Sequence, residues 1–214
     1  MSKMFVENTH DVAGNPSLFS NIMSRDLSTM KVLFISPGGG DIDPKLYGEQ
    51  NTDSNTYRPD IDKREFRLIQ KLLNERVPLI GICRGHQMIA AAIGAKLIQD
   101  IDKAGYIEHE FHHKISVLEE SVVATILEGD RQVNSLHHQA VVRDSIPTDW
   151  KVSAISNDGI VEAIEHEDYP VISVQWHPEM LHGQLSDMYH FVFQTYMNPE
   201  EGEQLYDIVQ PKWG

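Results

Sequence analysis

The sequence predicts an α/β fold in which a mostly parallel central sheet carries helices on both faces. Two observations support this fold class. Short apolar runs such as KVLFIS (Lys31–Ser36) and VPLIGI (Val77–Ile82) end in glycine-rich turns, as buried parallel strands do. Amphipathic helical patterns lie between such runs. A chain of 214 residues can bury a sizeable core, so we expect a single domain over 1–214, with its core at about 31–197 and an acidic tail at 198–214.

The part of the chain before Lys31 is predicted to be short. Met4–Glu7 is expected to form a first strand, and Ser17–Met23 one or two helical turns. Between them, Asn8–Pro16 is rich in Asn, Asp, Gly and Pro, a composition that predicts a loop.

The middle of the chain is predicted to contain one long surface helix. After a polar loop at Lys45–Pro59, apolar side chains such as Phe66 and Ile69 recur on one face of Asp62–Glu75. The second half is predicted to consist mainly of short strands, after an irregular stretch at 99–111. These strands, with a final amphipathic helix, are expected at Lys96–Ile98, Ile115–Leu118, Val122–Leu127 (a hairpin with the preceding strand), Val133–Val142 (a strand that runs into a loop), Trp150–Ser156, Val161–Glu165, Val171–Gln175 and Leu185–Met197 (the helix).

Cys83 is the only cysteine, and it lies in the most informative stretch of the sequence. It stands between the predicted strand Val77–Ile82 and a predicted helix that ends near Gly94, and Gly81 and Gly85 flank it. This spacing is typical of a nucleophile elbow, a sharp strand-to-helix turn that exposes a reactive side chain at a helix N-terminus. Such a position favours thiolate over thiol. The alternative is a buried structural cysteine.

Two other stretches offer the groups that a nucleophilic cysteine needs. Glycines 38–40 follow a predicted strand and leave backbone N–H groups bare, which would hold a developing oxyanion. A plain tight turn is the alternative there. Near the end of the chain, an apolar strand leads to His177, and Glu179 follows two residues later. That spacing lets the carboxylate orient the imidazole and stabilise its charged form. A histidine that only caps a strand end is the alternative.

Composition limits the partners and the compartment. Asp and Glu outnumber Lys and Arg by 32 to 18, and the resulting net charge of −14 argues against nucleic acid binding. No apolar run is long enough for a membrane span, and the N-terminus lacks the apolar core of a signal peptide. A single cysteine cannot form an internal disulfide, so we expect a cytoplasmic protein. No cofactor is expected.

Five motifs follow one another between about residues 31 and 195. They are SPGGGDIDP (Ser36–Pro44), GICRGHQ (Gly81–Gln87), NSLHHQ (Asn134–Gln139), DGIVEA (Asp158–Ala163) and QWHPE (Gln175–Glu179). In this order they resemble the class I glutamine amidotransferases, which carry a Cys-His-Glu triad. The likeness is greatest to the branch of the γ-glutamyl hydrolases and γ-glutamyl-γ-aminobutyrate hydrolase. Arg84 and the His-His-Gln run favour that branch over biosynthetic subunits, which more often carry Leu or Phe after the nucleophile.

The resemblance implies a fold and an activity. The fold would be a flavodoxin-like three-layer sandwich with a small antiparallel β extension and an abbreviated N-terminal unit. The activity would be hydrolysis of the γ-glutamyl amide bond of glutamine, or of a γ-glutamyl amine or peptide, through a glutamyl thioester. Cys83 would be the nucleophile, His177 the base and Glu179 its orienting partner. The resemblance also implies an oxyanion hole from the backbone of Arg84 and of Gly38 or Gly39, and substrate binding by Gln87, His137, His138 and Gln139.

Several alternatives stay open at this point. The protein would also fit a glutaminase subunit that passes ammonia to a separate synthetase partner, or a non-catalytic binding protein on the same fold. The short N-terminal unit leaves a sheet edge that an oligomer contact would cover. His137 and His138 equally fit a polar strand end. His109, His112 and His113 cluster in sequence but lack the Cys or helical i, i+4 pair typical of zinc sites, so no metal site is predicted.

Overall fold

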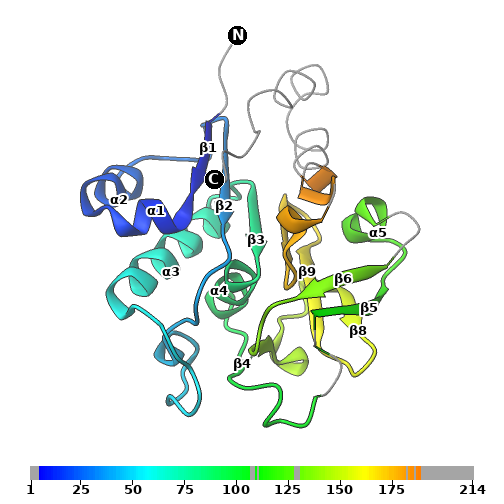
Figure 1. The fold of residues 1–214 in the computed structure, drawn as a ribbon. Helices are drawn as coiled ribbons and strands as arrows, with labels where there is room; N and C mark the ends of the chain where they lie inside the picture. The colour runs from blue at the N-terminus through cyan, green and yellow to red at the C-terminus, as the bar shows by residue number, and fades with distance from the viewer. Residues whose placement is uncertain are drawn as a thin grey trace.

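The sheet combines a parallel half with an antiparallel half. The structure, a computed structural model, describes residues 5–106, 109, 111–127, 131–181, 183–185 and 187–188. Within them, strands follow the spatial order β1-β2-β3-β10-β9-β8-β5-β6, and β4 and β7 pair with each other beside β9 (Figure 1). The parallel strands are β1 (Phe5–Asn8), β2 (Val32–Ser36), β3 (Leu79–Ile82) and β10 (Val171–Val174).

Because these four strands run parallel, their carboxyl ends meet at one edge of the sheet, where open α/β sheets bind ligands. Beyond β10 every pairing in the described residues is antiparallel. The strands of this half are β4 (Leu97–Ile98), β5 (Phe111–Val117), β6 (Gln132–Ser135), β7 (Ala140–Val141), β8 (Trp150–Ser156) and β9 (Val161–His166).

The longer helices lie beside the parallel half. In Figure 1, α1 to α3 lie on the left and α4 lies near the centre beside β3, whereas β5, β6 and β8 lie on the right. The described helices are α1 (Thr9–Gly14), α2 (Pro16–Met23), α3 (Pro59–Asn74), α4 (Arg84–Ala92) and α5 (Val122–Ile126), with 3-10 turns η1 (Pro44–Tyr47), η2 (Arg143–Ser145) and η3 (Pro178–Met180). None of the helices in the described part of the chain has the length and apolarity of a membrane-spanning segment.

The sheet is buried on both faces, as the continuous apolar strands predict. Phe34 of β2 packs in one core cluster with residues of α3 and α4, and its neighbour Leu33 packs in a second cluster on the other face. Val123 of α5 and Leu185 belong to that second cluster. The predicted arrangement, helices on both faces of the sheet, is therefore confirmed.

The N-terminal prediction is right about the strand and wrong about the loop. One strand, β1, precedes β2 in the described residues, as expected for an abbreviated unit. Asn8–Pro16 is not a loop, because most of it forms α1. The side chain of Asn8 accepts hydrogen bonds from His10 N and Asp11 N, and Asn15 caps α2 in the same way. Asparagines that look like turn formers in the sequence are helix N-caps here.

The predicted strand at Val122–Leu127 is also wrong. Ser121 Oγ accepts a hydrogen bond from Ala124 N, and this cap starts the short helix α5. The partners of β5 are instead β6 and β8. Most of the predicted helix at Leu185–Met197, and the tail at 198–214, lie outside the described residues.

Candidate active site

Cys83 lies on a strained turn between β3 and α4. Its φ of 48° and ψ of −103° are unusual for a residue with a side chain, and such strain concentrates at functional sites. The backbone N–H of Cys83 donates to Val174 O of β10 at 2.8 Å, which fixes the turn to the sheet. A Cβ on Gly85 would lie 1.9 Å from Ser36 O, and one on Gly81 2.6 Å from Ile89 Cδ1. Only glycine fits at either position, as the elbow motif predicts.

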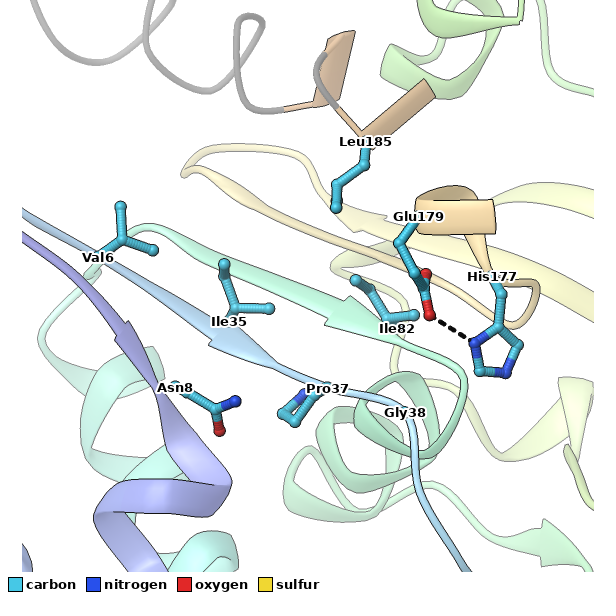
Figure 2. Close-up of a pocket in the computed structure, with 9 residues that line it drawn as sticks. All are labelled: Val6, Asn8, Ile35, Pro37, Gly38, Ile82, His177, Glu179 and Leu185. Carbon is cyan, nitrogen blue, oxygen red and sulfur yellow. Dashed lines mark hydrogen bonds and ion pairs between the residues drawn. The ribbon is translucent and has the colours of Figure 1, made fainter. Parts of the chain in front are cut away.

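His177 stands at the end of β10, where two sets of hydrogen bonds fix it. Its Nδ1 lies 2.6 Å from Glu179 Oε1, the contact drawn in Figure 2. Its backbone N–H donates to Asn134 Oδ1 at 2.8 Å, and Asn134 Nδ2 donates to His177 O at 2.9 Å. Asn134 belongs to one of the five motifs, but the sequence predicts no role for it. Its amide holds the backbone of His177 in place from β6.

The contacts of the His177 ring keep it positively charged. A hydrogen bond with Cys83 and a second with Glu179 raise the pKa of His177 to about 10, although partial burial acts against the charge. Cys83 is only 5% exposed and borders apolar side chains. Its sulfur nevertheless has one polar neighbour, because Gln175 Nε2 lies 3.7 Å from Sγ. The structure therefore brings Cys83, His177 and Glu179 together, in surroundings that favour the charged form of the ring.

The glycine loop after β2 lies directly against this group. A Cβ on Gly38 would lie 2.7 Å from His177 Cε1 and 3.8 Å from Cys83 Cβ. A Cβ on Gly39 would lie 2.9 Å from Arg84 Cδ. Bare backbone thus borders Cys83 and His177. Arg84 is the first residue of α4, so its N–H has no partner within the helix.

Arg84 anchors the elbow to α3 through contacts that the sequence did not reveal. Its Nη1 donates to Glu65 Oε2 at 2.6 Å and its Nη2 to Asp62 Oδ1 at 2.8 Å, and all three side chains are buried. Burial raises the pKa of Glu65, but hydrogen bonds from His10 and Thr9 and the charge of Arg84 outweigh it and lower this pKa to about 2. The only sign of this salt bridge in the sequence is the spacing of Asp62 and Glu65, three residues apart on the predicted amphipathic helix.

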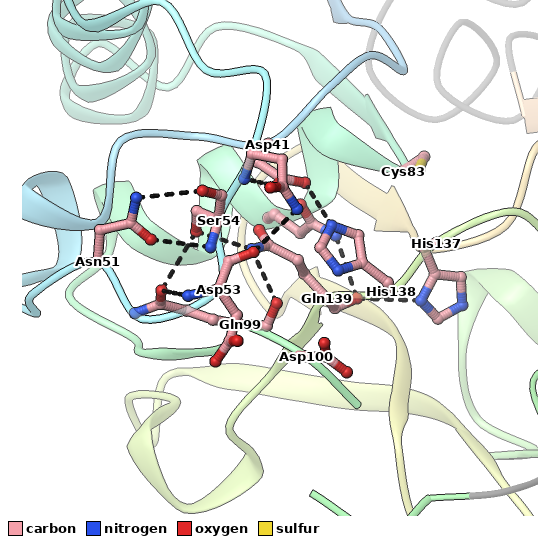
Figure 3. Close-up of polar contacts among 12 residues, drawn as sticks. Asp41, Asn51, Asp53, Ser54, Cys83, Gln99, Asp100, His137, His138 and Gln139 are labelled. Carbon is pink, nitrogen blue, oxygen red and sulfur yellow. Dashed lines mark hydrogen bonds and ion pairs between the residues drawn. The ribbon is translucent and has the colours of Figure 1, made fainter. Parts of the chain in front are cut away.

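The predicted substrate residues divide into exposed and buried ones. Figure 3 shows His138 and Gln139 with their polar partners. The side chain of His138 is 39% exposed, and its Nε2 lies 2.9 Å from Asp41 Oδ1. Gln139 is buried, and its Nε2 donates to Ser54 Oγ at 2.8 Å and to Gln99 O at 3.1 Å. His138 therefore connects the segment after β6 to the loop between β2 and α3. Gln139 connects the same segment to that loop and to the residue after β4.

Gln87 and His137 also have partners within the protein. Gln87 Nε2 lies 3.2 Å from both Gln139 O and Gln175 Oε1. His137 Nδ1 lies 3.0 Å from Gln139 O, and its side chain is 1% exposed. Burial lowers the pKa of His137. Direct contact of Gln87, His137 or Gln139 with a substrate stays a prediction.

A cavity of about 380 Å³ borders His177 and Glu179. Figure 2 shows apolar side chains from β1, β2 and β3 around it. Its lining consists of Val6, Asn8, Ile35, Pro37, Gly38, Ile82, His177, Glu179 and Leu185. The cavity places the His177–Glu179 pair beside apolar surface, where a charged hydrogen bond is stronger than in water.

A cysteine on a strand-to-helix elbow, a histidine and a glutamate thus lie together at the carboxyl edge of the parallel sheet. The chain belongs to the Peptidase C26 family, whose model matches residues 15–179. This family assignment confirms the resemblance to class I glutamine amidotransferase-like proteins.

Individual relatives agree with the family. The chain is 39% identical over 153 residues to the putative glutamine amidotransferase-like protein YvdE of Lactococcus lactis, a match over 66% of this chain and 63% of that protein. It is 29% identical over 180 residues to a gamma-glutamyl-gamma-aminobutyrate hydrolase of Escherichia coli O157:H7, a match over 77% and 68% of the two chains. The chain thus spans slightly less than two thirds of YvdE.

A solved structure supports the fold. The crystal structure of a glutamine amidotransferase from Thermotoga maritima superimposes with a TM-score of 0.51 over 96% of this chain and 92% of that chain. The two sequences are 16% identical, so the likeness concerns the fold. It agrees with the flavodoxin-like arrangement expected from the sequence.

Proposed function

We propose that this protein is a cysteine hydrolase that cleaves the γ-glutamyl amide bond of glutamine or of a γ-glutamyl amine or peptide. The observation that carries the proposal is the arrangement of His177, whose Nδ1 lies 2.6 Å from Glu179 Oε1 and whose pKa the neighbouring Cys83 and Glu179 raise to about 10. A positively charged imidazole beside the sulfur stabilises a thiolate, the form of cysteine that attacks a carbonyl carbon.

The proposed reaction has two stages. The sulfur of Cys83 adds to the γ-carbonyl carbon, and His177 gives its proton to the leaving amine as the carbon–nitrogen bond breaks. Water then attacks the resulting thioester, His177 accepts a proton from it, and the carbon–sulfur bond breaks to release glutamate. Glu179 keeps the ring oriented and stabilises its charge through both stages.

The oxyanion of each tetrahedral intermediate needs preorganised donors. We assign this role to the backbone N–H groups of Arg84 and Gly38, with Gly39 as the alternative glycine. The position of the Gly38 backbone beside Cys83 and His177 supports this choice. His138, which is partly exposed, is proposed as a wall of the substrate pocket, and Gln87, His137 and Gln139 as buried residues that shape this wall.

A second candidate is the glutaminase subunit of an ammonia-transferring enzyme with a separate synthetase partner. The name of the relative YvdE, a putative glutamine amidotransferase-like protein, favours it. The two candidates differ in substrate: a hydrolase would cleave γ-glutamyl amines or peptides unaided, and a subunit would act on free glutamine in dependence on its partner. A single catalytic thiol fits a reducing compartment, and we propose the cytoplasm.

The test is a product assay across glutamine, γ-glutamyl amines and γ-glutamyl peptides. We expect the purified protein to release glutamate from at least one of them. Cys83→Ala should abolish release, and retained turnover in this variant would refute the mechanism. Cys83→Ser is a matched control for folding, because it keeps a side chain of similar size at the elbow.

A further inference from the structure

Four buried side chains meet in the antiparallel half of the sheet. His109 precedes β5, His113 lies on β5, His137 follows β6, and Glu162 lies on β9. Glu162 Oε1 lies 3.0 Å from His113 Nε2, 3.6 Å from His109 Nδ1 and 4.0 Å from His137 Nε2. The side chain of Glu162 is 0% exposed, and none of the three histidines is more than 4% exposed. The triad uses none of these four side chains.

The cluster leaves several polar atoms unsatisfied. Among the described residues, the ion pairs of Glu162 are all with these histidines. Glu162 Oε2, His109 Nδ1 and His137 Nε2 are buried and have no hydrogen-bond partner in that part of the chain. Burying a carboxylate and bare ring nitrogens together is unfavourable unless something positive compensates them.

The outer contacts of two histidines fix which nitrogen faces inward as an acceptor. His137 Nδ1 lies 3.0 Å from Gln139 O, and a carbonyl oxygen can only accept, so this nitrogen carries the hydrogen. His109 Nε2 lies 3.0 Å from Asp158 Oδ1, which is likewise an acceptor. In their neutral forms, both rings therefore direct a lone pair from the other nitrogen toward Glu162.

We propose that His109 Nδ1, His137 Nε2 and the carboxylate of Glu162 bind a divalent transition metal, with zinc as the best fit. Their ligand atoms lie within 4.8 Å of one another. Ligands at 2.0–2.1 Å from a tetrahedral zinc are separated by about 3.3 Å, so small side-chain shifts close the site. Two imidazoles and a carboxylate suit zinc, whereas calcium and magnesium take oxygen ligands.

The surroundings fit the proposal. A metal-bound histidine typically donates its other N–H to a carboxylate or a backbone carbonyl, as His109 and His137 do here with Asp158 and Gln139. His113, which contacts Glu162 Oε1, would orient the carboxylate. The metal would join β9 to the segments before β5 and after β6, and so fix the segment that carries His138. The sequence predicted no metal because the partners of His109 lie far along the chain.

The test is metal binding by the full chain after treatment with a chelator. We expect one equivalent of Co²⁺ to give visible absorption bands of a four- or five-coordinate ion, and Zn²⁺ to displace it. His109→Ala and Glu162→Gln should each weaken binding at least 100-fold. His112→Ala is the matched control, because His112 is an exposed neighbour on β5 and should leave binding unchanged.

A second measurement covers variants that fold poorly. At a free Zn²⁺ concentration of about 100 times Kd, the Tm of the unmutated protein and of His112→Ala should rise by roughly 5–10 °C. The Tm of His109→Ala should rise by no more than about 2 °C. A wild-type chain that binds no Co²⁺, or a His109→Ala variant that binds it equally well, overturns the proposal. Neither measurement uses turnover, so the result is independent of the proposed function.

Discussion

The most direct test of the site geometry is the substitution Gly38→Ala. The added Cβ would lie 2.7 Å from His177 Cε1, whereas ordinary contacts begin at 3.4 Å. The ring has little freedom to yield, because Glu179 holds Nδ1 at 2.6 Å and Asn134 holds the backbone on both sides. Either the ring or the glycine loop must therefore move by about 0.7 Å or more.

A displacement of this size at a catalytic base costs on the order of 100-fold in rate. We expect Gly38→Ala to lower kcat by about that factor and to slow iodoacetamide alkylation at neutral pH. Cys83 is the only cysteine, so the modified residue is unambiguous. The free energy of unfolding should fall by no more than about 3 kcal/mol, the usual range for overpacking.

Gly14→Ala controls for the general effect of replacing glycine. Gly14 ends α1, has an ordinary φ, and has no atom within 4 Å of an added Cβ. This variant should keep full activity and gain up to about 1 kcal/mol in stability. If Gly38→Ala alkylates and turns over like the wild type, the placement of the loop against His177 is wrong.

Two further predictions concern charged side chains. Arg84→Met removes the guanidinium from both buried carboxylates, Glu65 and Asp62, and should lower the free energy of unfolding at pH 7 by about 3–5 kcal/mol. Arg131→Met, at an exposed pair, should cost less than about 1 kcal/mol. The pKa of Glu65 is lowered to about 2, so the stability that ionised Glu65 gives the fold is complete above pH 4.5 and is lost toward pH 2. The loss of stability caused by Arg84→Met, measured by urea unfolding, should therefore be smaller at pH 3 than at pH 5. The effect of Glu179→Gln should have the opposite pH dependence. The pKa of His177 is raised to about 10, so the stability that charged His177 gives the fold is complete below pH 6.5 and is lost as pH rises through 10. Urea unfolding at pH 6 and pH 10.5 should therefore show a larger Glu179→Gln penalty at pH 6, and equal penalties would contradict the charged state of His177.

The strands that carry the site were predictable because burial on both faces leaves a strong local signal. β2 and β3 are continuous apolar runs, and the glycines after each run stand where an added Cβ would be too close to a neighbouring residue. Helices α1 and α5 were missed for a local reason too. Each has fewer than two turns, so it shows almost no periodic pattern, and its capping residue, Asn8 or Ser121, equally suits a loop.

The candidate site was predictable where it depends on neighbours in sequence. Glu179 follows His177 by two residues, and Gly81 and Gly85 flank Cys83. Contacts between residues far apart in the chain could not be predicted from local sequence. The salt bridge of Arg84 depends on which face α3 turns toward α4. The histidine cluster depends on sheet pairing, because Glu162 approaches His113 only when β5 and β9 lie on either side of β8.

The salt bridge of Arg84 also connects the elbow to the first strand and helix that the structure describes. Thr9 Oγ1 donates to Glu65 Oε1 at 2.6 Å, and Ser36 Oγ lies 3.1 Å from the same oxygen. Arg84 binds the other oxygen, so Glu65 joins α1, β2 and the catalytic turn through a single buried carboxylate. A lone buried carboxylate would be unfavourable. Because Thr9 begins α1 directly after β1, its hydrogen bond helps to satisfy Glu65 and, through Glu65, to hold Arg84, the residue that follows Cys83.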